Sequence, residues 1–413
     1  MPDYSDLIRV FGKIGLLSFG GPAAQISLMQ TELVDRRKWL GEKQFLQALS
    51  FCMLLPGPEA MQLATYAGWR LRGVPGGLIA GLLFVLPGAC VILGLAFGYV
   101  YFGDLPVVQA VFAGVKAAVV IIVIQALSKL AGRALLDWQA RALALAAFGA
   151  IFVLSVPFPV IIAMAALIGL FRASTPPDKP LTKNDFSTVK TLRTILIWGG
   201  LWLAPVVLLW IAGSDLLLDV ALFFSKLAVV TFGGAYAVLA YMTQEIVQSY
   251  GWLTTEQMID ALGLAETTPG PLILVTQFAA FVAGFQHSGP GLAVLAALIC
   301  LWVTFVPCFL WIFAAAPYVE TLLAKPRLQG AFDAIAASVA GVILNLAVWF
   351  SLHVLFDEVT HGTYGPVVRF ADFSGFDAGL VALAACLFVG LRLSMLSGLA
   401  VMAGLTGLLH VVM

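Results

Sequence analysis

Charge is what this 413-residue sequence has least of. Asp, Glu, Lys and Arg make up 11% of it and cancel to a net charge of zero, whereas soluble domains carry about 25% charged residues. Hydrophobic residues make up 61% and the mean hydropathy is +1.01, which excludes an ordinary soluble or disordered chain. No basic run is longer than Arg36-Arg37-Lys38, so a nucleic-acid partner is excluded as well. The composition predicts a polytopic membrane protein.

Clusters of reactive side chains are also missing. No Cys-x-x-Cys, metal-type His spacing, Gly-x-Ser-x-Gly or phosphate loop occurs, so we expect no metal, no cofactor and no enzyme activity. The cysteines stand singly in apolar stretches, where they pack as small hydrophobes; they are Cys52, Cys90, Cys300, Cys308 and Cys386. Residues 1–6 lack the basic region and cleavage site of a secretory signal, so we expect the chain to keep its start.

What the sequence does have is an internal repeat. Residues 11–58 align without a gap on residues 224–271, at an offset of 213, and seventeen of the 48 positions are identical. The identical residues include glycine pairs, a Pro-Gly-Pro, a Trp-Leu and single Lys and Glu residues, rather than the interchangeable aliphatic residues of membrane helices. From Pro87, which aligns with Pro307, the offset is 220. Each half therefore carries the same functional unit.

Glycine and proline interrupt the helices of both copies. We call Gly20-Gly21 and Gly233-Gly234 the Gly-Gly breaks, and Pro56-Gly57-Pro58 and Pro269-Gly270-Pro271 the Pro-Gly-Pro breaks. The apolar segments beside the first break, 7–18 and 23–34, are too short to span a ~30 Å hydrocarbon core. Broken or re-entrant helices are therefore predicted, and their free backbone must be buried in protein or line a wet cavity.

The rest of the chain supplies longer spans and a linker. Complete spans are predicted at 76–102, 107–130, 195–212, 292–316 and 331–355. The segment 172–193 is rich in Pro, Thr, Asp and Lys, which is typical of a linker. We expect a first membrane repeat at 1–171, a cytoplasmic linker at 172–193, a single crossing helix at 194–215 and a second membrane repeat at 216–413.

The positive charges predict that the two repeats face opposite ways. In the first repeat, Arg36 to Lys38, Arg70 and Arg72 mark loops that the positive-inside rule places in the cytoplasm. The equivalent loops of the second repeat carry no Lys or Arg, whereas Lys325 and Arg327 fill a turn whose first-half counterpart has no positive charge. The predicted fold class is an all-α polytopic membrane protein with two inverted-topology homologous repeats, broken at the Gly-Gly and Pro-Gly-Pro motifs. This architecture is typical of secondary transporters, which bind substrate near the midplane between repeats.

The breaks suit an anion. A half-helix that begins inside the membrane points free N–H groups and a partial positive charge at the space before it, and glycine lets a ligand approach the backbone closely. The predicted substrate site comprises the break residues, together with neutral polar side chains that either contact substrate or join helices. These residues are Gly20, Gly21, Pro22, Pro56, Gly57, Pro58, Gly233, Gly234, Pro269, Gly270, Pro271, Gln62, Thr267 and Thr268, with Gln25 and Gln277 nearby.

Three lysines in apolar segments extend the candidate site. Lys13 and Lys226 occupy the same place in the two copies and either face the substrate or reach the nearby membrane surface. Lys116 lies near the middle of a complete span, where reaching the surface is hard, so an ion-pair or pathway role is favoured.

Two carboxylates flank the Pro-Gly-Pro breaks. Glu59 and Glu266 are candidates for carrying a coupling proton, because burial and an arriving dianion both favour a protonated carboxylate. The alternatives are a partner of the helix dipole for Glu59 and an exposed loop residue for Glu266.

The paired motifs resemble those of a known family. Ser18 to Pro22 with Leu55 to Pro58, and Thr231 to Gly234 with Ala265 to Leu272, are similar to the chromate ion transporter family in its long, two-domain form. The resemblance implies a bacterial inner-membrane transporter that exports chromate, driven by the proton-motive force and related to sulfate handling, since both ions are tetrahedral dianions. One departure is Ala235, which stands where the family often has a third glycine.

Three readings follow. The favoured one is a secondary active transporter of a divalent oxyanion, in which rocking of the repeats exposes the site alternately to each side. A passive anion channel would use the same helix ends without proton coupling, and a membrane enzyme lacks its motifs. The expected partners are a small oxyanion and the lipid bilayer, and a homodimer is compatible with the compact set of spans. Chromate and sulfate are not distinguished by the residues themselves.

Overall fold

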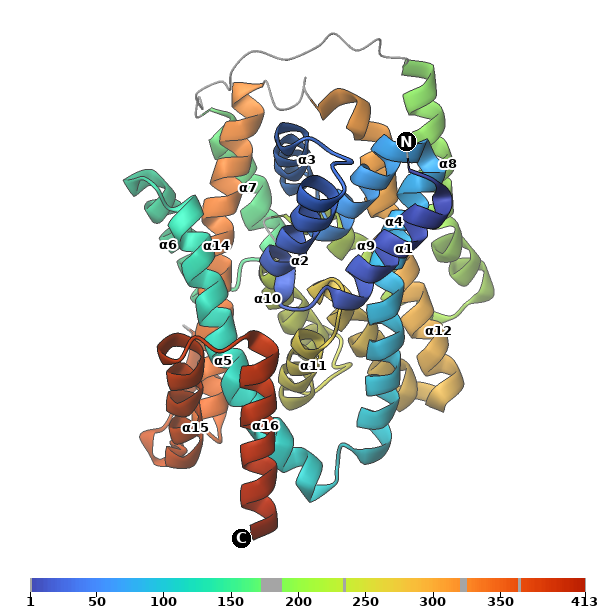
Figure 1. Cartoon of the computed structure of the whole chain (residues 1–413). Helices are drawn as coiled ribbons and strands as arrows, with labels where there is room; N and C mark the ends of the chain where they lie inside the picture. Colours follow the sequence, from blue (N-terminus) through green and yellow to red (C-terminus); the bar gives the residue numbers. More distant parts are fainter. Residues whose placement is uncertain (1, 172–187, 233–234, 320–324, 363–364, 413) are drawn as a thin grey trace. The chain divides into compact units, whose positions relative to one another are not determined.

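The computed structural model describes residues 2–171, 188–232, 235–319, 325–362 and 365–412. The prediction of an all-α polytopic membrane protein is confirmed, because helices form almost the whole described chain (Figure 1). Within the described ranges, six helical stretches are long and apolar enough to cross a membrane. They are Glu59–Phe102, Pro106–Ala134, Thr188–Ala212, Leu272–Tyr318, Pro326–Leu355 and Met395–Val412. The second Gly-Gly break and residues 172–187 of the predicted linker lie outside the described residues.

The first half of the chain runs from α1 to α7. Its elements are α1 (Tyr4–Leu17), α2 (Gly21–Gln30), the π-helix η1 (Thr31–Arg36), α3 (Glu42–Leu54), α4 (Glu59–Phe102), α5 (Pro106–Ala134), α6 (Trp138–Phe152) and α7 (Phe158–Leu170). The helices stop at the predicted Gly-Gly and Pro-Gly-Pro breaks.

The second half repeats this order after α8 (Thr188–Ala212). It contains α9 (Asp215–Val230), α10 (Ala235–Gln244), the π-helix η2 (Glu245–Ser249), α11 (Thr255–Thr267), η3 (Leu272–Leu274), α12 (Val275–Ala315), η4 (Ala316–Tyr318) and α14 (Pro326–Leu355). The antiparallel strands β1 (Val359–Gly362) and β2 (Gly365–Val368) follow, then η5 (Phe370–Asp372), α15 (Gly375–Ala385), η6 (Cys386–Gly390) and α16 (Met395–Val412). The inverted sense of the two halves and their boundaries stay predictions.

The two long helices α4 and α12 each contain a sharp reversal. Arg72 and Gly73 leave helical geometry in α4, and Ser288 and Gly289 do so in α12, with nearly the same backbone angles. Gly73 has φ of 64° and Gly289 has φ of 77°, which only glycine adopts readily. Gly68 then lies so close to the second arm of α4 that a Cβ there would strike Gly76 and Ala80. Each long helix is therefore a hairpin of two helical arms.

The described chain divides into two compact units, and each takes segments from both halves. The first unit contains Met1–Ala96, Ser174–Ala235 and Thr268–Gln329, and the second contains Phe97–Ala173, Tyr236–Thr267 and Gly330–Met413. These units group residues that lie close together in space, whereas the repeats are defined by sequence similarity. The division therefore does not test the predicted repeat boundaries.

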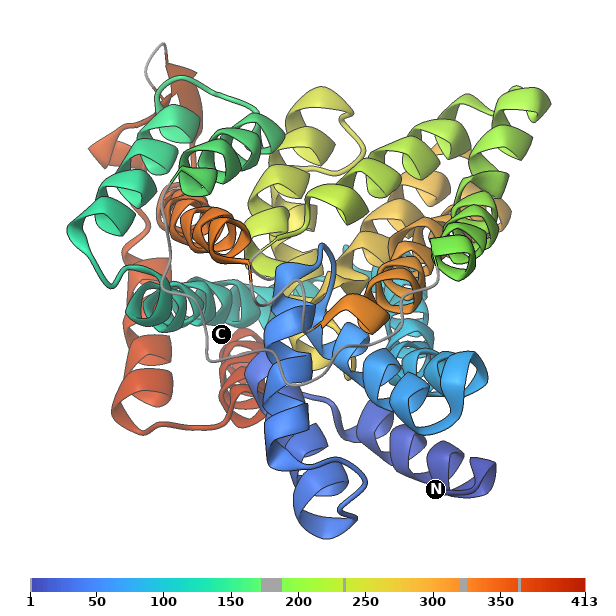
Figure 2. The same cartoon turned by 90° about the horizontal axis from the view of Figure 1, so that it is seen from above.

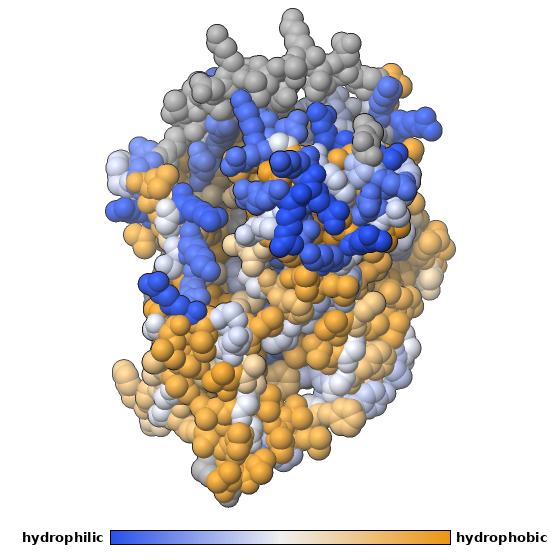
Figure 3. Space-filling model, in the orientation of Figure 1, coloured by the Kyte–Doolittle hydropathy of each residue, from blue (hydrophilic) through white to orange (hydrophobic). Residues whose placement is uncertain are grey.

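Apolar packing holds the first unit together. Helices α8, α9 and α12 pack against one another (Figure 1), and Trp198 of α8 stacks on Phe309 of α12 with ring centroids 5.7 Å apart. The α2–α3 connection of this unit carries Arg36, Arg37 and Lys38, and the surface there is hydrophilic (Figure 3). This is what a loop in the aqueous phase requires.

The second unit is built around α5. Helices α11, α15 and α16 pack on it, and Figure 2 shows α5 beside α15 and α16 from above. Gly114 makes the approach to α16 possible, because a Cβ there would meet the Met402 carbonyl group. The outer face of α16 exposes Val401, Leu408 and Val412 and is hydrophobic in Figure 3, as expected for a helix in contact with lipid.

Candidate substrate site

Each Pro-Gly-Pro break contacts the other half of the chain in the first unit through one backbone hydrogen bond. The Gly57 N–H donates to the Thr231 carbonyl oxygen at 2.8 Å, and the Gly270 N–H donates to the Ser18 carbonyl oxygen at 2.9 Å. Gly57 corresponds to Gly270, and Ser18 to Thr231, at the repeat offset of 213. Each Pro-Gly-Pro break is therefore bonded to the helix end that precedes the Gly-Gly break of the other repeat.

The local sequence explains why these carbonyl groups are free to accept. Ser18 and Thr231 follow the last residues of α1 and α9, where carbonyl groups have no partner within the helix. Their hydroxyl groups turn back and donate to the carbonyl oxygens of Ile14, at 2.6 Å, and Leu227, at 2.5 Å. Each side chain thus closes the helix end, and each main-chain carbonyl faces the opposite repeat.

Two buried glutamines tie the breaks further. The Gln25 amide nitrogen donates to the carbonyl oxygens of Gly270, at 2.7 Å, and Ser18, at 3.2 Å. The Gln62 amide nitrogen donates to the Pro56 carbonyl oxygen at 2.7 Å. These carbonyl partners fix which end of each amide is the nitrogen. The amide oxygens Oε1 of both residues are buried and have no hydrogen-bond partner among the described residues.

Close packing covers both Pro-Gly-Pro breaks. A Cβ built on Gly88 would collide with the Pro269 carbonyl oxygen, and a Cβ built on Gly57 would lie 3.0 Å from the Cys308 sulfur. Gly88 and Cys308 are equivalent positions, each directly after the proline that aligns at offset 220. The same part of α4 and of α12 therefore lies against the break of the opposite repeat.

Helix N-termini begin at these breaks. Helix α2 starts at Gly21 with Gly20 at its N-cap in the left-handed region, and no side chain caps it. The α4 helix starts at Glu59, and η3, which leads into α12, starts after Pro271 without a side-chain cap. Uncapped N–H groups at a helix start attract an anion. Helix α10 starts at Ala235, next to the second Gly-Gly break outside the described residues.

Lys13 has a partner away from the breaks. Its ammonium group lies 2.7 Å from Glu32 Oε1, and Arg36 lies 2.8 Å from the same oxygen. The hydrogen bond from Lys13 holds the pKa of the Glu32 carboxyl below its ordinary value of 4.5, although burial of Glu32 opposes this. About 45% of the Lys13 side chain is exposed, so it reaches the surface as well as pairing. Lys226 occupies the matching place in α9.

Lys116 lies in the second unit and pairs with a residue that the sequence analysis did not select. Its ammonium nitrogen is 3.5 Å from Asp260 Oδ1, and the Tyr99 hydroxyl donates to Asp260 Oδ2 at 2.9 Å. Asp260 lies on α11 and aligns with Gln47 at the repeat offset, so the repeat gave no signal for it. An acidic residue inside the apolar half-helix before a break was the signal available.

Glu266 and Glu59 occupy different environments. Glu266 is buried, with 3% of its surface exposed, and accepts a hydrogen bond from the Tyr236 hydroxyl at 2.6 Å. The alternative that Glu266 is an exposed loop residue is therefore wrong. Glu59 is the half-buried first residue of α4, where a helix dipole favours a carboxylate. Thr267 donates to the Leu264 carbonyl oxygen at 2.7 Å, and Thr268 is buried.

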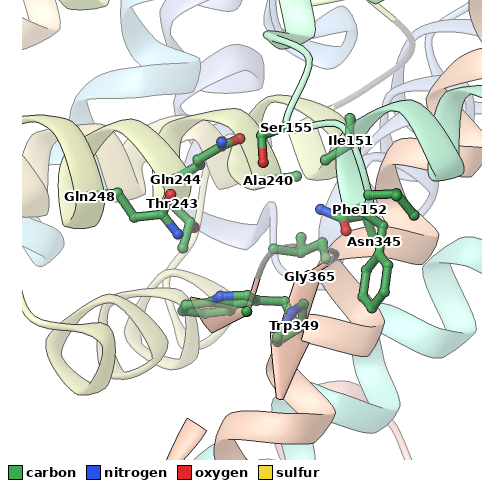
Figure 4. A pocket seen from close by; sticks show the side chains of 14 residues that line it. Ile151, Phe152, Ser155, Ala240, Thr243, Gln244, Gln248, Asn345, Trp349 and Gly365 are labelled. Carbon is green, nitrogen blue, oxygen red and sulfur yellow. The ribbon is translucent and has the colours of Figure 1, made fainter. Parts of the chain in front are cut away.

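A separate cavity of about 110 Å³ lies in the second unit. Figure 4 shows Ser155, Thr243, Gln244 and Asn345 around it. Its described lining residues include no charged side chain and none of the residues selected from the sequence. The breaks in the first unit, with their free helix ends, therefore remain the better candidate for an anion site.

Comparison with known proteins points to one family. The family profile described as "Chromate transporter" matches residues 5–170 and 218–408. The chain is 32% identical to a probable chromate transport protein of Synechococcus elongatus over 366 residues, which cover 87% of this chain and 88% of the relative. It is 33% identical to a chromate transport protein of Pseudomonas aeruginosa over 351 residues (82% and 79%), and 31% identical to one of Cupriavidus metallidurans over 366 residues (87% and 86%). No solved structure matches the chain.

Proposed function

Because the chain belongs to the chromate transporter family, we propose that it carries chromate across the membrane as a secondary active transporter. It is a multi-pass membrane protein of a transport family and not an enzyme. The proposal concerns the transported ion, the residues that bind it and the energy source that drives transport.

One observation carries the proposed site: the reciprocal hydrogen bonds from Gly57 to Thr231 and from Gly270 to Ser18. They bring both Pro-Gly-Pro breaks and the helix end before each Gly-Gly break into one unit. A tetrahedral dianion would be held by N–H groups at the starts of α2, α4 and η3, where the backbone supplies partial positive charge. The same N–H groups would also bind sulfate.

Transport would proceed by alternating access. The bonded breaks would act as a hinge between the repeats, so that movement of one repeat changes the access of the site to both sides. Glu266, which is buried against Tyr236, and Glu59, which begins α4, are the proposed carriers of the coupling proton. The proton-motive force would then drive export of chromate through a bacterial inner membrane. A homodimer is the oligomeric state proposed for the assembly.

Flux measurements test this proposal. The purified protein would be reconstituted into proteoliposomes, and the vesicles would be loaded with chromate or sulfate. The flux of the anion would then be measured with and without an imposed proton gradient. We expect chromate flux that the gradient accelerates and that Glu59→Gln makes insensitive to it. Flux that is equal with and without the gradient would instead identify a passive anion channel. Flux of neither anion would overturn the proposed substrate class.

A further inference from the structure

Lys116 and Asp260 form a pair at mid-membrane depth in the second unit, in which Asp260 is buried and Lys116 is partly exposed. Lys116 is the eleventh residue of the 29-residue helix α5, so it lies roughly 15 Å along a core of roughly 30 Å. Asp260 is 8% exposed by its side chain, and Lys116 is 24% exposed. Charged residues at this depth are costly and usually serve transport. Only the lysine of the pair remains open to an arriving ion.

The pair is not an optimised ion pair. The distance of 3.5 Å from Lys116 Nζ to Asp260 Oδ1 is longer than the roughly 2.7–2.9 Å of a strong charge-assisted hydrogen bond. By contrast, Lys13 lies 2.7 Å from Glu32. A looser contact costs less to break, so Lys116 is better suited than Lys13 to exchange one anionic partner for another.

The groups around Asp260 are suited to a change of protonation. Lys116 of α5, Tyr99 of α4 and Glu256 of α11 are the ionisable groups that act on it. Asp104 acts on Tyr99, and α16, which also packs on α11, carries His410 as its ionisable side chain. Tyr99 donates to Oδ2, so that oxygen keeps a hydrogen bond whether Lys116 is present or engaged elsewhere.

We propose that Lys116 and Asp260 form a charge switch, in which an oxyanion competes with Asp260 for Lys116 and Asp260 takes up a proton when it is displaced. This inference rests on the proposed function and adds a second anion position, in the second unit, that is distinct from the site at the breaks in the first. When the anion occupies Lys116, Asp260 has lost its cationic partner in a buried site, and an isolated buried charge is avoided by neutralisation. When the anion leaves, the proton returns to water and the ion pair re-forms. One proton is thereby bound for each dianion bound at Lys116. The pair moves one net negative charge, so the inside-negative membrane potential is the part of the proton-motive force that would drive export.

The switch predicts a specific pH dependence of binding. Deprotonated Asp260 competes with chromate, so wild-type affinity should fall as pH rises, by at most about ten-fold per pH unit for one coupled proton. Asp260→Asn has no carboxylate to compete and should lose this dependence. Chromate itself takes up a proton near neutral pH, but the ratio of wild-type to variant affinity at each pH removes that contribution.

Equilibrium dialysis of chromate against the purified full chain, from pH 5.5 to 8.5, measures this ratio. We expect the ratio of wild-type to Asp260→Asn affinity to fall steadily with pH, and Asp260→Glu to restore the wild-type slope. Glu358→Gln is the control, because it removes an exposed carboxylate elsewhere in the second unit and should follow the wild type. Lys116→Ala should abolish the pH-dependent part of chromate binding, whereas Lys129→Ala, which removes an exposed lysine from the same helix, should not.

Proton uptake gives a second readout that does not depend on affinity. Adding chromate to wild-type protein in weak buffer should remove protons from solution, as reported by a pH indicator. The Asp260→Asn protein should take up one proton fewer for each anion bound at Lys116. A constant affinity ratio with equal proton uptake in folded wild type and Asp260→Asn would overturn the switch and leave chromate transport standing. A wild-type protein that binds no chromate would overturn both proposals.

Discussion

The amide N–H of Gly57, in the Pro-Gly-Pro break of the first repeat, donates at 2.8 Å to the carbonyl oxygen of Thr231, at the end of α9 in the second repeat. Its counterpart joins Gly270 to Ser18 at 2.9 Å. Backbone groups without a helical partner are costly in a membrane, and here each repeat supplies what the other lacks. The proposed site is therefore a product of both repeats, and neither repeat could form it alone.

Gly57→Ala should disrupt this bond. Gly57 has φ of +122°, and a Cβ would lie 2.7 Å from the Gln62 amide nitrogen and 3.0 Å from the Cys308 sulfur. Strain of this kind costs on the order of 1–3 kcal/mol. We expect a lower unfolding temperature in detergent, read by scanning fluorimetry. Gly94→Ala is the control, because nothing lies within 4 Å of a Cβ there and alanine favours the α4 helix; its stability should be unchanged or higher.

Gln25→Leu should weaken the contact between the Pro-Gly-Pro break at Gly270 and the first repeat. It removes two hydrogen bonds and leaves the Gly270 carbonyl with one partner fewer in a buried site, which costs about 1–3 kcal/mol. We expect both stability and chromate flux in proteoliposomes to fall. Gln125→Leu removes a comparable bond to the Phe388 carbonyl in the second unit and should lower stability without a matching loss of flux. Equal flux losses in the two variants would contradict a special role for Gln25.

Glu266→Gln tests the buried carboxylate. Glutamine keeps a hydrogen-bond acceptor for the Tyr236 hydroxyl, which lies 2.6 Å from Glu266 Oε1, but it cannot release a proton. We expect chromate flux that continues down a chromate gradient and no longer responds to a pH gradient. Tyr236→Phe, which leaves the carboxylate able to titrate, should retain the response. A Glu266→Gln protein with an intact pH response would exclude Glu266 as the proton carrier.

Glu32 should make the protein acid-sensitive. Lys13 and Arg36 lower the pKa of Glu32 in the folded state. The ion pairs therefore contribute their full stability at pH values above the ordinary pKa of 4.5. This stability is lost as the pH falls through the lowered pKa of the folded state. Glu32→Gln should therefore unfold at a lower temperature than wild type at pH 7, and the difference should shrink towards pH 3. Thermal unfolding in detergent at both pH values measures it. A constant difference would show that packing, and not charge, is what Glu32 contributes.

Sequence reasoning located the breaks because they depend on local chemistry. Glycine and proline favour breaks in a helix wherever they occur, so the sequence alone identifies these positions without knowledge of the segments they contact. The structure agrees, because Gly20, Gly57 and Gly270 all have positive φ. Asp260, the partner of Lys116, could not be predicted because the two residues lie far apart in the sequence and only the packing of α5 on α11 brings them together. Likewise, the burial of Glu266 depends on how α10 and α11 pack, which its place beside a break left open.

The central claim is that the breaks of both repeats form one anion site, and chromate binding tests it most directly. Equilibrium dialysis would compare wild type, Gly57→Ala, Gly270→Ala and Gly94→Ala, each first shown to be folded and monodisperse. We predict that both break variants weaken chromate binding at the breaks by about ten-fold or more, an amount equivalent to about 1.4 kcal/mol, although each alters a different repeat. Gly94→Ala should bind as wild type does. Unchanged binding in a folded Gly57→Ala or Gly270→Ala protein would contradict a site shared by the two repeats.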